Sequence, residues 1–132
     1  MLEILPIQSK QEQEALCARC GVRFQTELLA YKTVSEGDLC GICQFTLDAT
    51  GGRIVDFAPV PDHDEFDPMF AMGRAALNFI DLCGVHLAFF DAACENETLI
   101  KAIGFSRNND GRYEMNLTDF FKDPCKHTPK NS

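Results

Sequence analysis

One stretch of the chain, residues 53–91, restricts the possible folds more than any other. It begins with an apolar segment, residues 53–60, and ends with a second one, residues 85–90. Between them, residues 68–83 carry apolar side chains at helical spacing, and Gly84 ends the pattern. A strand, a helix and a strand joined this closely form a crossover, which places both strands parallel in one sheet. The stretch therefore predicts an α/β fold.

The start of the predicted helix is marked by two residues, Asp67 and Pro68. Aspartate is a good N-cap, and proline suits the first helical position because its missing N–H would have no partner there. A helix N-terminus at the carboxyl end of a parallel strand is where α/β proteins usually hold an anionic ligand. We therefore expect the functional site at this end of the helix.

The chain ahead of the crossover predicts one helix and three further strands. Ser9 and Glu12 form a capping box that opens the helix, and Gly21 ends it. Turn signals separate the strands, so we expect these strands to run antiparallel into the crossover. The predicted strands are residues 2–7, 28–34 and 39–47.

The chain after the crossover predicts a short helix over residues 97–103 and a last strand over residues 112–117. The expected order is therefore β-α-β-β-β-α-β-α-β. We predict a single domain over residues 1–117 and a C-terminal tail over residues 118–132.

Charge and cysteine content limit the classes of partner and compartment. Twenty acidic and 12 basic residues give a net charge of −8, which argues against nucleic acid or an anionic membrane as a partner. The apolar runs are too short to span a bilayer, and no secretory signal is visible. Seven cysteines in a chain without a leader are best explained as reduced thiols. We therefore predict a cytoplasmic protein that could form a homodimer through an exposed strand or through the phenylalanine-rich tail.

Three short matches add to this order of elements. The first is Gly41 on the third strand, and the second is the segment 71–77, Ala-Met-Gly-Arg-Ala-Ala-Leu. The third is the segment 99–105, which ends in Gly-Phe and is followed by Tyr-Glu-Met at 113–115. On these features the chain resembles the GCN5-related N-acetyltransferase (GNAT) superfamily over roughly residues 2–117. The resemblance implies a mixed, twisted sheet with helices on both faces, and acetyl transfer from acetyl-CoA to an amine.

The acyl-CoA motif of that family is degenerate in this chain. The family pattern is Arg or Gln, two residues, Gly, one residue, then Gly or Ala, and its positions here hold Pro68, Ala71 and Gly73. In the motif, successive backbone N–H groups hold the pyrophosphate. The resemblance implies that the cofactor contacts two backbone segments. Their residues are Phe57, Ala58, Val60, Ala71, Met72, Gly73 and Arg74.

An acidic loop stands just ahead of the helix. Residues 62–67 include four carboxylates, each of which would repel a pyrophosphate by up to about 1 kcal/mol at close range in a water-like dielectric. Only His63 and Arg74 offset this charge locally. The alternative is that the carboxylates form a solvated rim and that Asp67 caps the helix.

Two residues are candidates for acid–base catalysis. The family's usual acid, a tyrosine four residues before the Gly-Phe pair, is Ile100 here, and Tyr113 on the last strand is the nearest substitute. Asp56, in the middle of a strand of the crossover, is the candidate base. Each has a structural alternative: Tyr113 as a core residue and Asp56 as a solvated one.

Two Cys-x2-Cys pairs have a spacing that also occurs in structural zinc sites. They are Cys17 with Cys20 and Cys40 with Cys43. A strand would point Cys40 and Cys43 to opposite faces, whereas zinc needs four thiolates at one point. We therefore predict packed thiols and no metal site.

Two functions remain open. The first is an N-acetyltransferase that uses acetyl-CoA and an unidentified small-molecule amine. The second is a GNAT-like module that has lost acetyl-CoA binding and binds a small molecule or a protein instead.

Overall fold

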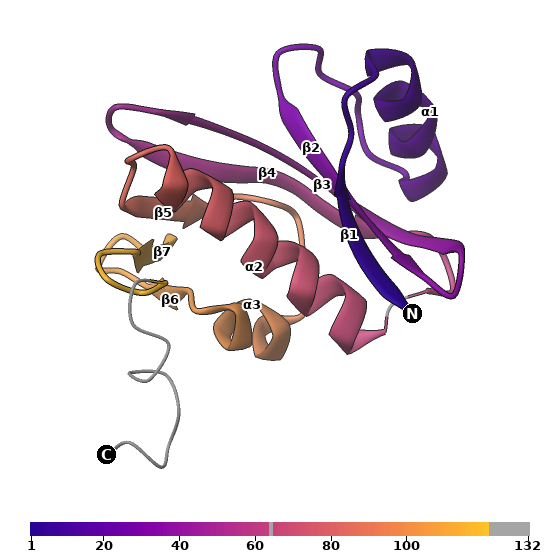
Figure 1. Ribbon diagram of the computed structural model, residues 1–132. Coiled ribbons are helices and arrows are strands. Elements are labelled where there is room, and N and C mark those ends of the chain that lie inside the picture. The colour runs from indigo at the N-terminus through magenta and orange to yellow at the C-terminus, as the bar shows by residue number, and fades with distance from the viewer. Residues whose placement is uncertain (64, 122–132) are drawn as a thin grey trace.

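The protein forms one seven-stranded mixed sheet in the order β1-β2-β3-β4-β5-β7-β6 (Figure 1). The structure is a computed structural model, and it describes residues 1–63 and 65–121. β1 to β4 pair antiparallel in chain order. The strands are β1 (Leu2–Pro6), β2 (Leu29–Ser35), β3 (Asp38–Asp48), β4 (Gly51–Pro59), β5 (Leu87–Phe90), β6 (Ser106–Arg107) and β7 (Tyr113–Asn116).

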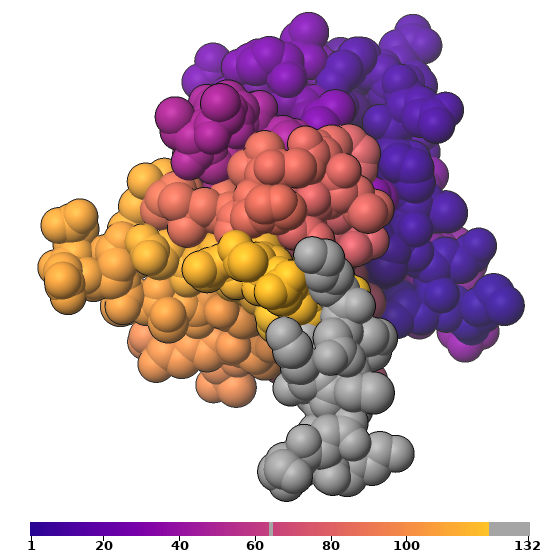
Figure 2. Space-filling view, turned by 60° about the vertical axis from the view of Figure 1, so that its left-hand side comes forward, coloured from indigo at the N-terminus to yellow at the C-terminus, as the bar shows by residue number. Residues whose placement is uncertain are grey.

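Three helices cover the two faces of this sheet (Figure 1). α1 (Lys10–Cys20) packs in a small apolar cluster on one face, and α2 (Phe66–Leu82) and α3 (Glu97–Ile103) pack in the main core on the other. Figure 2 shows α2 at the surface, between the N-terminal strands in indigo and the C-terminal part in yellow. No helix in the described residues has the length and apolar character needed to cross a membrane.

The predicted crossover is confirmed. β4 and β5 run parallel, with Gly52, Arg53 and Ile54 opposite Ala88, Phe89 and Phe90, and α2 connects the two strands. The Ser9 cap and the Gly21 stop of α1 are also confirmed: the Ser9 hydroxyl accepts from the Glu12 N–H at 3.2 Å, and Gly21 has the left-handed backbone that glycine permits.

The predicted start of α2 is wrong. The helix begins at Phe66 with Glu65 as its N-cap, and Glu65 makes no side-chain capping bond. Asp67 therefore lies inside the first turn, where its charge still favours the helix dipole. Pro68 is the third helical residue, and its missing N–H costs nothing because that group has no intrahelical partner. Pro68 is therefore compatible with a helix that begins two residues earlier than predicted.

The C-terminal part contains one strand that the sequence did not predict. β6 has only two residues and pairs antiparallel with β7. Beyond β7, Phe120 and Phe121 pack against the main core. The remainder of the predicted tail, residues 122–132, lies outside the described residues.

A close approach of α2 to the sheet occurs at Gly41 on β3. A Cβ atom there would lie 2.7 Å from the Met69 sulfur and 2.8 Å from the Ala58 carbonyl oxygen. The glycine therefore lets the first turn of α2 lie directly on the end of β3 and β4. This contact sets the position of the helix end at which we expected the site.

Candidate functional site

β4 and β5 part halfway along β4. Their ladder ends at Ile54 and Phe90, with one more bond from the Asp91 N–H to the Ile54 carbonyl at 2.9 Å. β4 continues to Pro59 without β5 beside it. A parallel pair that opens at its carboxyl end leaves backbone N–H and C=O groups available to a ligand. The gap between these strands is the candidate functional site.

A β-bulge at Val55 explains why the strands part there. Opposite β3, Gln44 pairs with Asp56 and Phe45 pairs with Ile54, so Val55 is an extra residue. A bulge bends its strand and increases its twist. β4 therefore bends directly after Ile54, its last residue paired with β5.

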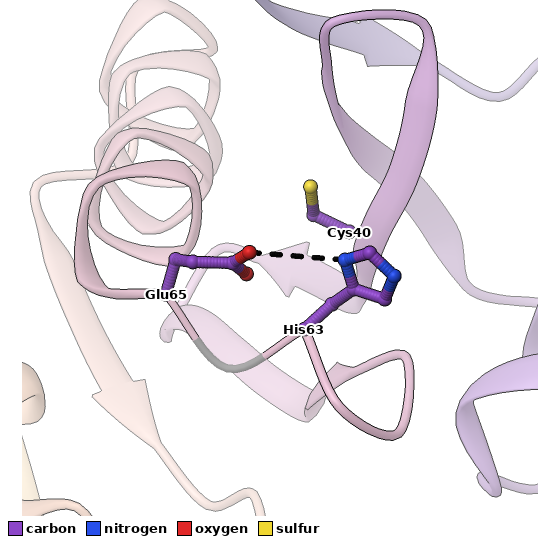
Figure 3. A group of neighbouring side chains, drawn as sticks. All are labelled: Cys40, His63 and Glu65. Atoms are coloured by element: carbon purple, nitrogen blue, oxygen red, sulfur yellow. Dashed lines mark ion pairs between the residues drawn. The ribbon is translucent and has the colours of Figure 1, made fainter.

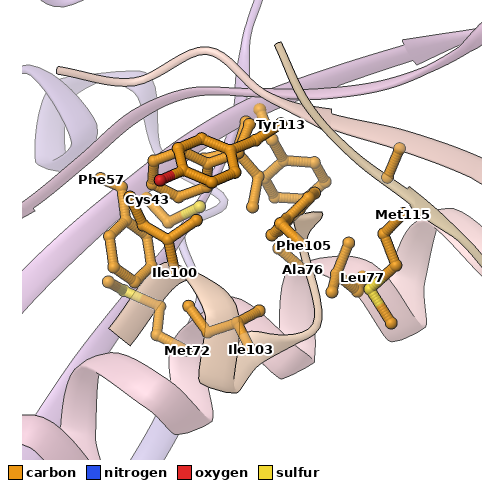
Figure 4. Packing of buried hydrophobic residues seen from close by; sticks show 14 of the residues in the cluster. Cys43, Phe57, Met72, Ala76, Leu77, Ile100, Ile103, Phe105, Tyr113 and Met115 are labelled. Carbon is orange, nitrogen blue, oxygen red and sulfur yellow. The ribbon is translucent and has the colours of Figure 1, made fainter. Parts of the chain in front are cut away.

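Aromatic side chains pack together in the main core on the α2 face, among them Phe57, Phe105 and Tyr113 (Figure 4). The Phe57 and Phe90 rings meet edge to face with centroids 5.4 Å apart, and Phe90 meets Phe105 at the same distance. Phe57 is 3% exposed. A ligand entering from this face would have to displace these rings.

The predicted cofactor residues at 71–74 lie within α2 rather than at its end. Because α2 begins at Phe66, the N–H groups of residues 71–74 fall in the part of the helix that bonds internally. The free N–H groups of the first turn belong to Glu65, Phe66 and Asp67. Residues 71–74 therefore have their backbone N–H groups bonded within the helix, and their role in cofactor binding stays a prediction.

The side chains of these residues contact α3 and the core. Met72 is fully buried. A Cβ on Gly73 would lie 2.6 Å from Ile103 Cδ1. Ala71 is half-buried. Gly73 thus allows α2 and α3 to pack closely against each other.

Arg74 hydrogen-bonds to backbone carbonyl groups at the C-terminal end of α3. Its Nε donates to the Ile103 carbonyl at 2.7 Å and its second guanidinium nitrogen donates to the Ala102 carbonyl at 3.3 Å. The guanidinium also lies 4.8 Å from the Phe70 ring and 4.9 Å from the Phe120 ring. Burial lowers the pKa of Arg74 from its usual range. The cation predicted to offset the acidic loop is therefore already used within the fold.

Asp56 belongs to a polar network beneath α1. Its Oδ2 accepts from the Gln44 amide at 2.6 Å. Gln44 in turn accepts at 2.8 Å from Gln13 of α1, which also donates to the Leu28 carbonyl. Gln13 and Gln44 are fully buried. The candidate base is half-buried and held by a side-chain donor.

Tyr113 lies on β7 against the main core. Its hydroxyl donates to Glu97 Oε1 at 3.0 Å, and the Arg107 guanidinium lies 4.3 Å from its ring. Burial, followed by the hydrogen bond to Glu97, raises the pKa of the Tyr113 phenol. The group therefore stays protonated near neutral pH, as an acid must.

The structure places the two catalytic candidates on opposite faces of the sheet. Asp56 lies with α1, whereas Tyr113 lies in the core beneath α2 and α3. The predicted strand residues divide in the same way: Phe57 faces α2, whereas Ala58 and Val60 pack in the α1 cluster. A ligand that touches both sets would have to pass through the gap.

A hollow of about 480 Å³ borders the N-terminus of α2. Three of its lining side chains are carboxylates, those of Glu36, Glu65 and Asp67. The N-terminal ammonium group, also at this hollow, pairs with Glu36 at 2.5 Å. Of the loop carboxylates, Glu65 and Asp67 line this hollow, whereas Asp64 lies outside the described residues.

Sequence reasoning missed Gln13, Gln44 and the bulge. Gln44 stands between apolar neighbours on β3, and such a polar residue in a buried strand needs a partner. The bulge also left a signal, because Ile54 and Phe57 are three residues apart and cannot share one face of a regular strand. Both are buried in the same core.

No family model matches the chain, and no curated protein matches its sequence. Solved structures do match. The ribosomal-protein-S18-alanine N-acetyltransferase of Escherichia coli has a TM-score of 0.65 at 13% identity, covering 89% of this chain and 94% of its own. Mutant forms of the spermidine/spermine N-acetyltransferase SpeG of Vibrio cholerae have a TM-score of 0.69 at 10% identity, covering 92% of this chain and 98% of their own. A Bacillus subtilis acetyltransferase in complex with CoA has a TM-score of 0.68 at 12% identity, covering 89% of this chain and 99% of its own.

These likenesses confirm the predicted fold. The chain has the mixed α/β architecture of the GNAT acetyltransferases over nearly its whole described length. At these identities the likeness concerns the fold, and the activity has to be argued from the site.

Proposed function

We propose that the protein is an N-acetyltransferase that uses acetyl-CoA as the acyl donor and an amine as the acceptor. The observation that carries this proposal is the bulge at Val55, with the gap that opens directly after Ile54. The solved structures with this fold are acetyltransferases, and one of them is a complex with CoA.

The gap suits the arm of an acyl-CoA. This arm is extended and contains two amide groups, so it is able to pair with the free backbone of residues 55–59 as an added strand would. The Phe57 and Phe90 rings would supply apolar contacts once displaced. The phosphates would then lie toward the start of α2, near the N–H groups of Glu65, Phe66 and Asp67.

The reaction requires little from the protein. The neutral amine nitrogen forms a bond to the thioester carbonyl carbon, and the C–S bond breaks as the tetrahedral intermediate collapses. The proton that the nitrogen loses balances the proton that the leaving CoA thiolate takes up. Asp56 would accept a proton from the ammonium form of the acceptor on the α1 face. Tyr113, whose pKa is raised, would be the candidate donor to the leaving thiolate, provided its hydroxyl leaves Glu97.

A second function is favoured by two specific observations. The N–H groups of residues 71–74 are internal to α2, and three carboxylates line the hollow at its end. Both features oppose pyrophosphate binding, and the second adds repulsion of up to about 1 kcal/mol per close charge. On this alternative, the chain is a GNAT-like module that binds another small molecule or a protein.

Calorimetric titration with acetyl-CoA separates the two functions. Acetyl-pantetheine, which lacks the nucleotide, is the second ligand. Micromolar binding of acetyl-CoA, with weaker binding of acetyl-pantetheine, would support the acetyltransferase, and a screen of amines for acetylation would follow. Absence of binding at millimolar ligand would reject it and leave the module.

A charge variant tests whether the phosphates of acetyl-CoA lie at the N-terminus of α2. Asp67→Asn removes an exposed carboxylate from the hollow and should tighten acetyl-CoA binding several-fold while leaving acetyl-pantetheine unchanged. Asp110→Asn, in the exposed turn before β7, is the matched control. Equal effects of the two variants would mean that the phosphates do not lie at α2.

A further inference from the structure

Three potential metal ligands meet where β3, the loop after β4 and the start of α2 come together. They are the thiol of Cys40, the imidazole of His63 and the carboxylate of Glu65 (Figure 3). One ligand atom from each lies within 4.8 Å of the others. Within the described residues this is the only group of three or more such side chains.

Backbone bonds hold the loop against β3. The Val60 N–H donates to the Cys40 carbonyl at 2.7 Å, and the His63 N–H donates back to the Val60 carbonyl at 2.9 Å. Asp62, inside this turn, has a left-handed backbone with φ of 73°. The turn reverses the chain, so that His63 and Glu65 return toward Cys40 of β3, which lies 23 and 25 positions earlier.

The distances are near those of a metal site. In a tetrahedral zinc site the ligand atoms are about 3.3–3.6 Å apart, given metal–ligand bonds of about 2.0–2.3 Å. His63 Nδ1 and Glu65 Oε1 are 3.8 Å apart. Cys40 is fixed in a strand and is 2% exposed, whereas the other two side chains are partly exposed on a loop. Closure therefore needs a shift of at most about 1.5 Å, which the side chains of His63 and Glu65 are able to make.

The ligand chemistry favours zinc over a hard cation. A thiolate and an imidazole are ligands of zinc and its neighbours, whereas calcium and magnesium select oxygen ligands. Cys40 and Glu65 together would carry two negative charges, which neutralise a divalent ion. The nearby carboxylates of Asp38 and Asp67 add to the negative field.

We propose that Cys40, His63 and Glu65 bind one Zn²⁺ ion, with a water molecule as the fourth ligand. The site is distinct from the Cys-x2-Cys arrangement considered from the sequence: Cys43 faces α2 in the main core, whereas Cys17 and Cys20 pack with α1. Because Glu65 is the N-cap of α2 and lines the hollow beside it, the ion would fix this end of the helix. The inference does not depend on acetyl-CoA binding.

Metal binding to the full-length apo protein tests the proposal. Zn²⁺ should bind at one equivalent, measured by calorimetry and by metal content after dialysis. Co²⁺ should give the thiolate-to-cobalt charge-transfer band and the intense visible bands of a tetrahedral site. His63→Gln and Glu65→Gln should each weaken binding by about 10-fold or more, and Cys40→Ser should abolish the charge-transfer band. His63 lies in a loop, and the Glu65 side chain makes no capping bond to α2, so both variants should fold normally.

Matched variants identify the ligands. His86→Gln and Cys83→Ser should leave stoichiometry and affinity unchanged. Binding that survives His63→Gln and Glu65→Gln but is lost with Cys17→Ser would overturn the proposal, as would the absence of any one-equivalent binding. Neither result would affect the acetyltransferase proposal, because these titrations contain no CoA.

Discussion

Gly73 of α2 lies against Ile103 of α3 with no room for a side chain. A Cβ at Gly73 would approach Ile103 Cδ1 to 2.6 Å and Cγ1 to 3.1 Å, and Ile103 is fully buried. The two helices therefore meet at a glycine that the sequence had connected with a cofactor.

Gly73→Ala should destabilise the protein. Overpacking costs about 1–3 kcal/mol, and the gain in helix propensity returns about 1 kcal/mol at most. Ile103→Val removes Cδ1, so Gly73→Ala should cost less in that background, with a coupling of at least about 0.5 kcal/mol. Urea unfolding of the four variants of the cycle measures this. Strictly additive effects would mean that the contact is not the reason for the glycine.

Arg74→Ala should destabilise the protein by about 1–3 kcal/mol, because two carbonyls at the end of α3 lose a charged donor. Arg74→Lys should recover only part of this, since an ammonium lacks the planar fork of the guanidinium. Lys101→Ala, on the exposed side of α3, is the control and should have little effect. Chemical denaturation of the three variants tests this order, and a neutral Arg74→Ala would contradict it.

Gln44→Leu should lower the free energy of unfolding by about 1–3 kcal/mol. The change removes the donor to Asp56 and to the Arg23 carbonyl and also the acceptor for Gln13. Exposed Gln11→Leu on α1 is the control. If the two substitutions lower the free energy of urea unfolding by the same amount, the buried hydrogen-bond network of Gln44 makes no specific contribution to stability.

The thiols of α1 should make stability fall at alkaline pH. Burial raises the pKa of Cys17 and of Cys20 from 9.0 to about 11. Between these values the unfolded chain has lost thiol protons that the folded chain retains, so the free energy of unfolding decreases as pH rises from about 9 to about 11. Below pH 9 the contribution is fully present.

Urea midpoints across this pH range measure the effect. Cys20→Ala should flatten the decline relative to the parent protein, whereas Cys83→Ser, at an exposed position, should not. Identical slopes for Cys20→Ala and the parent would show that the Cys20 thiol does not contribute.

The sequence predicted most of the architecture, because the signals for it are local. Helix caps such as Ser9 and Gly21, apolar alternation on β3 and the strand–helix–strand stretch all arise from neighbouring residues. The start of α2 was wrong because Asp67 and Pro68 are compatible with two positions in a first turn. β6 was missed because two residues have no detectable period.

The site was less predictable, since it depends on contacts between distant segments. The engagement of Arg74 with α3, and that of Asp56 with Gln44, link residues 29 and 12 positions apart. The approach of His63 to Cys40 depends on a turn whose geometry follows from Asp62. Residue types alone did not specify any of these pairings.

The extra residue at Val55 reverses which side chains of β4 face α2. Ahead of it, even-numbered residues such as Ile54 face α2; after it, odd-numbered residues such as Phe57 do. Deleting Val55 alone would remove the bulge: Ile54 and Asp56 would become consecutive and keep Phe45 and Gln44 as their partners on β3. A one-residue deletion would thereby straighten β4 at the point where its pairing with β5 ends, whereas most substitutions at the same position would keep the extra residue.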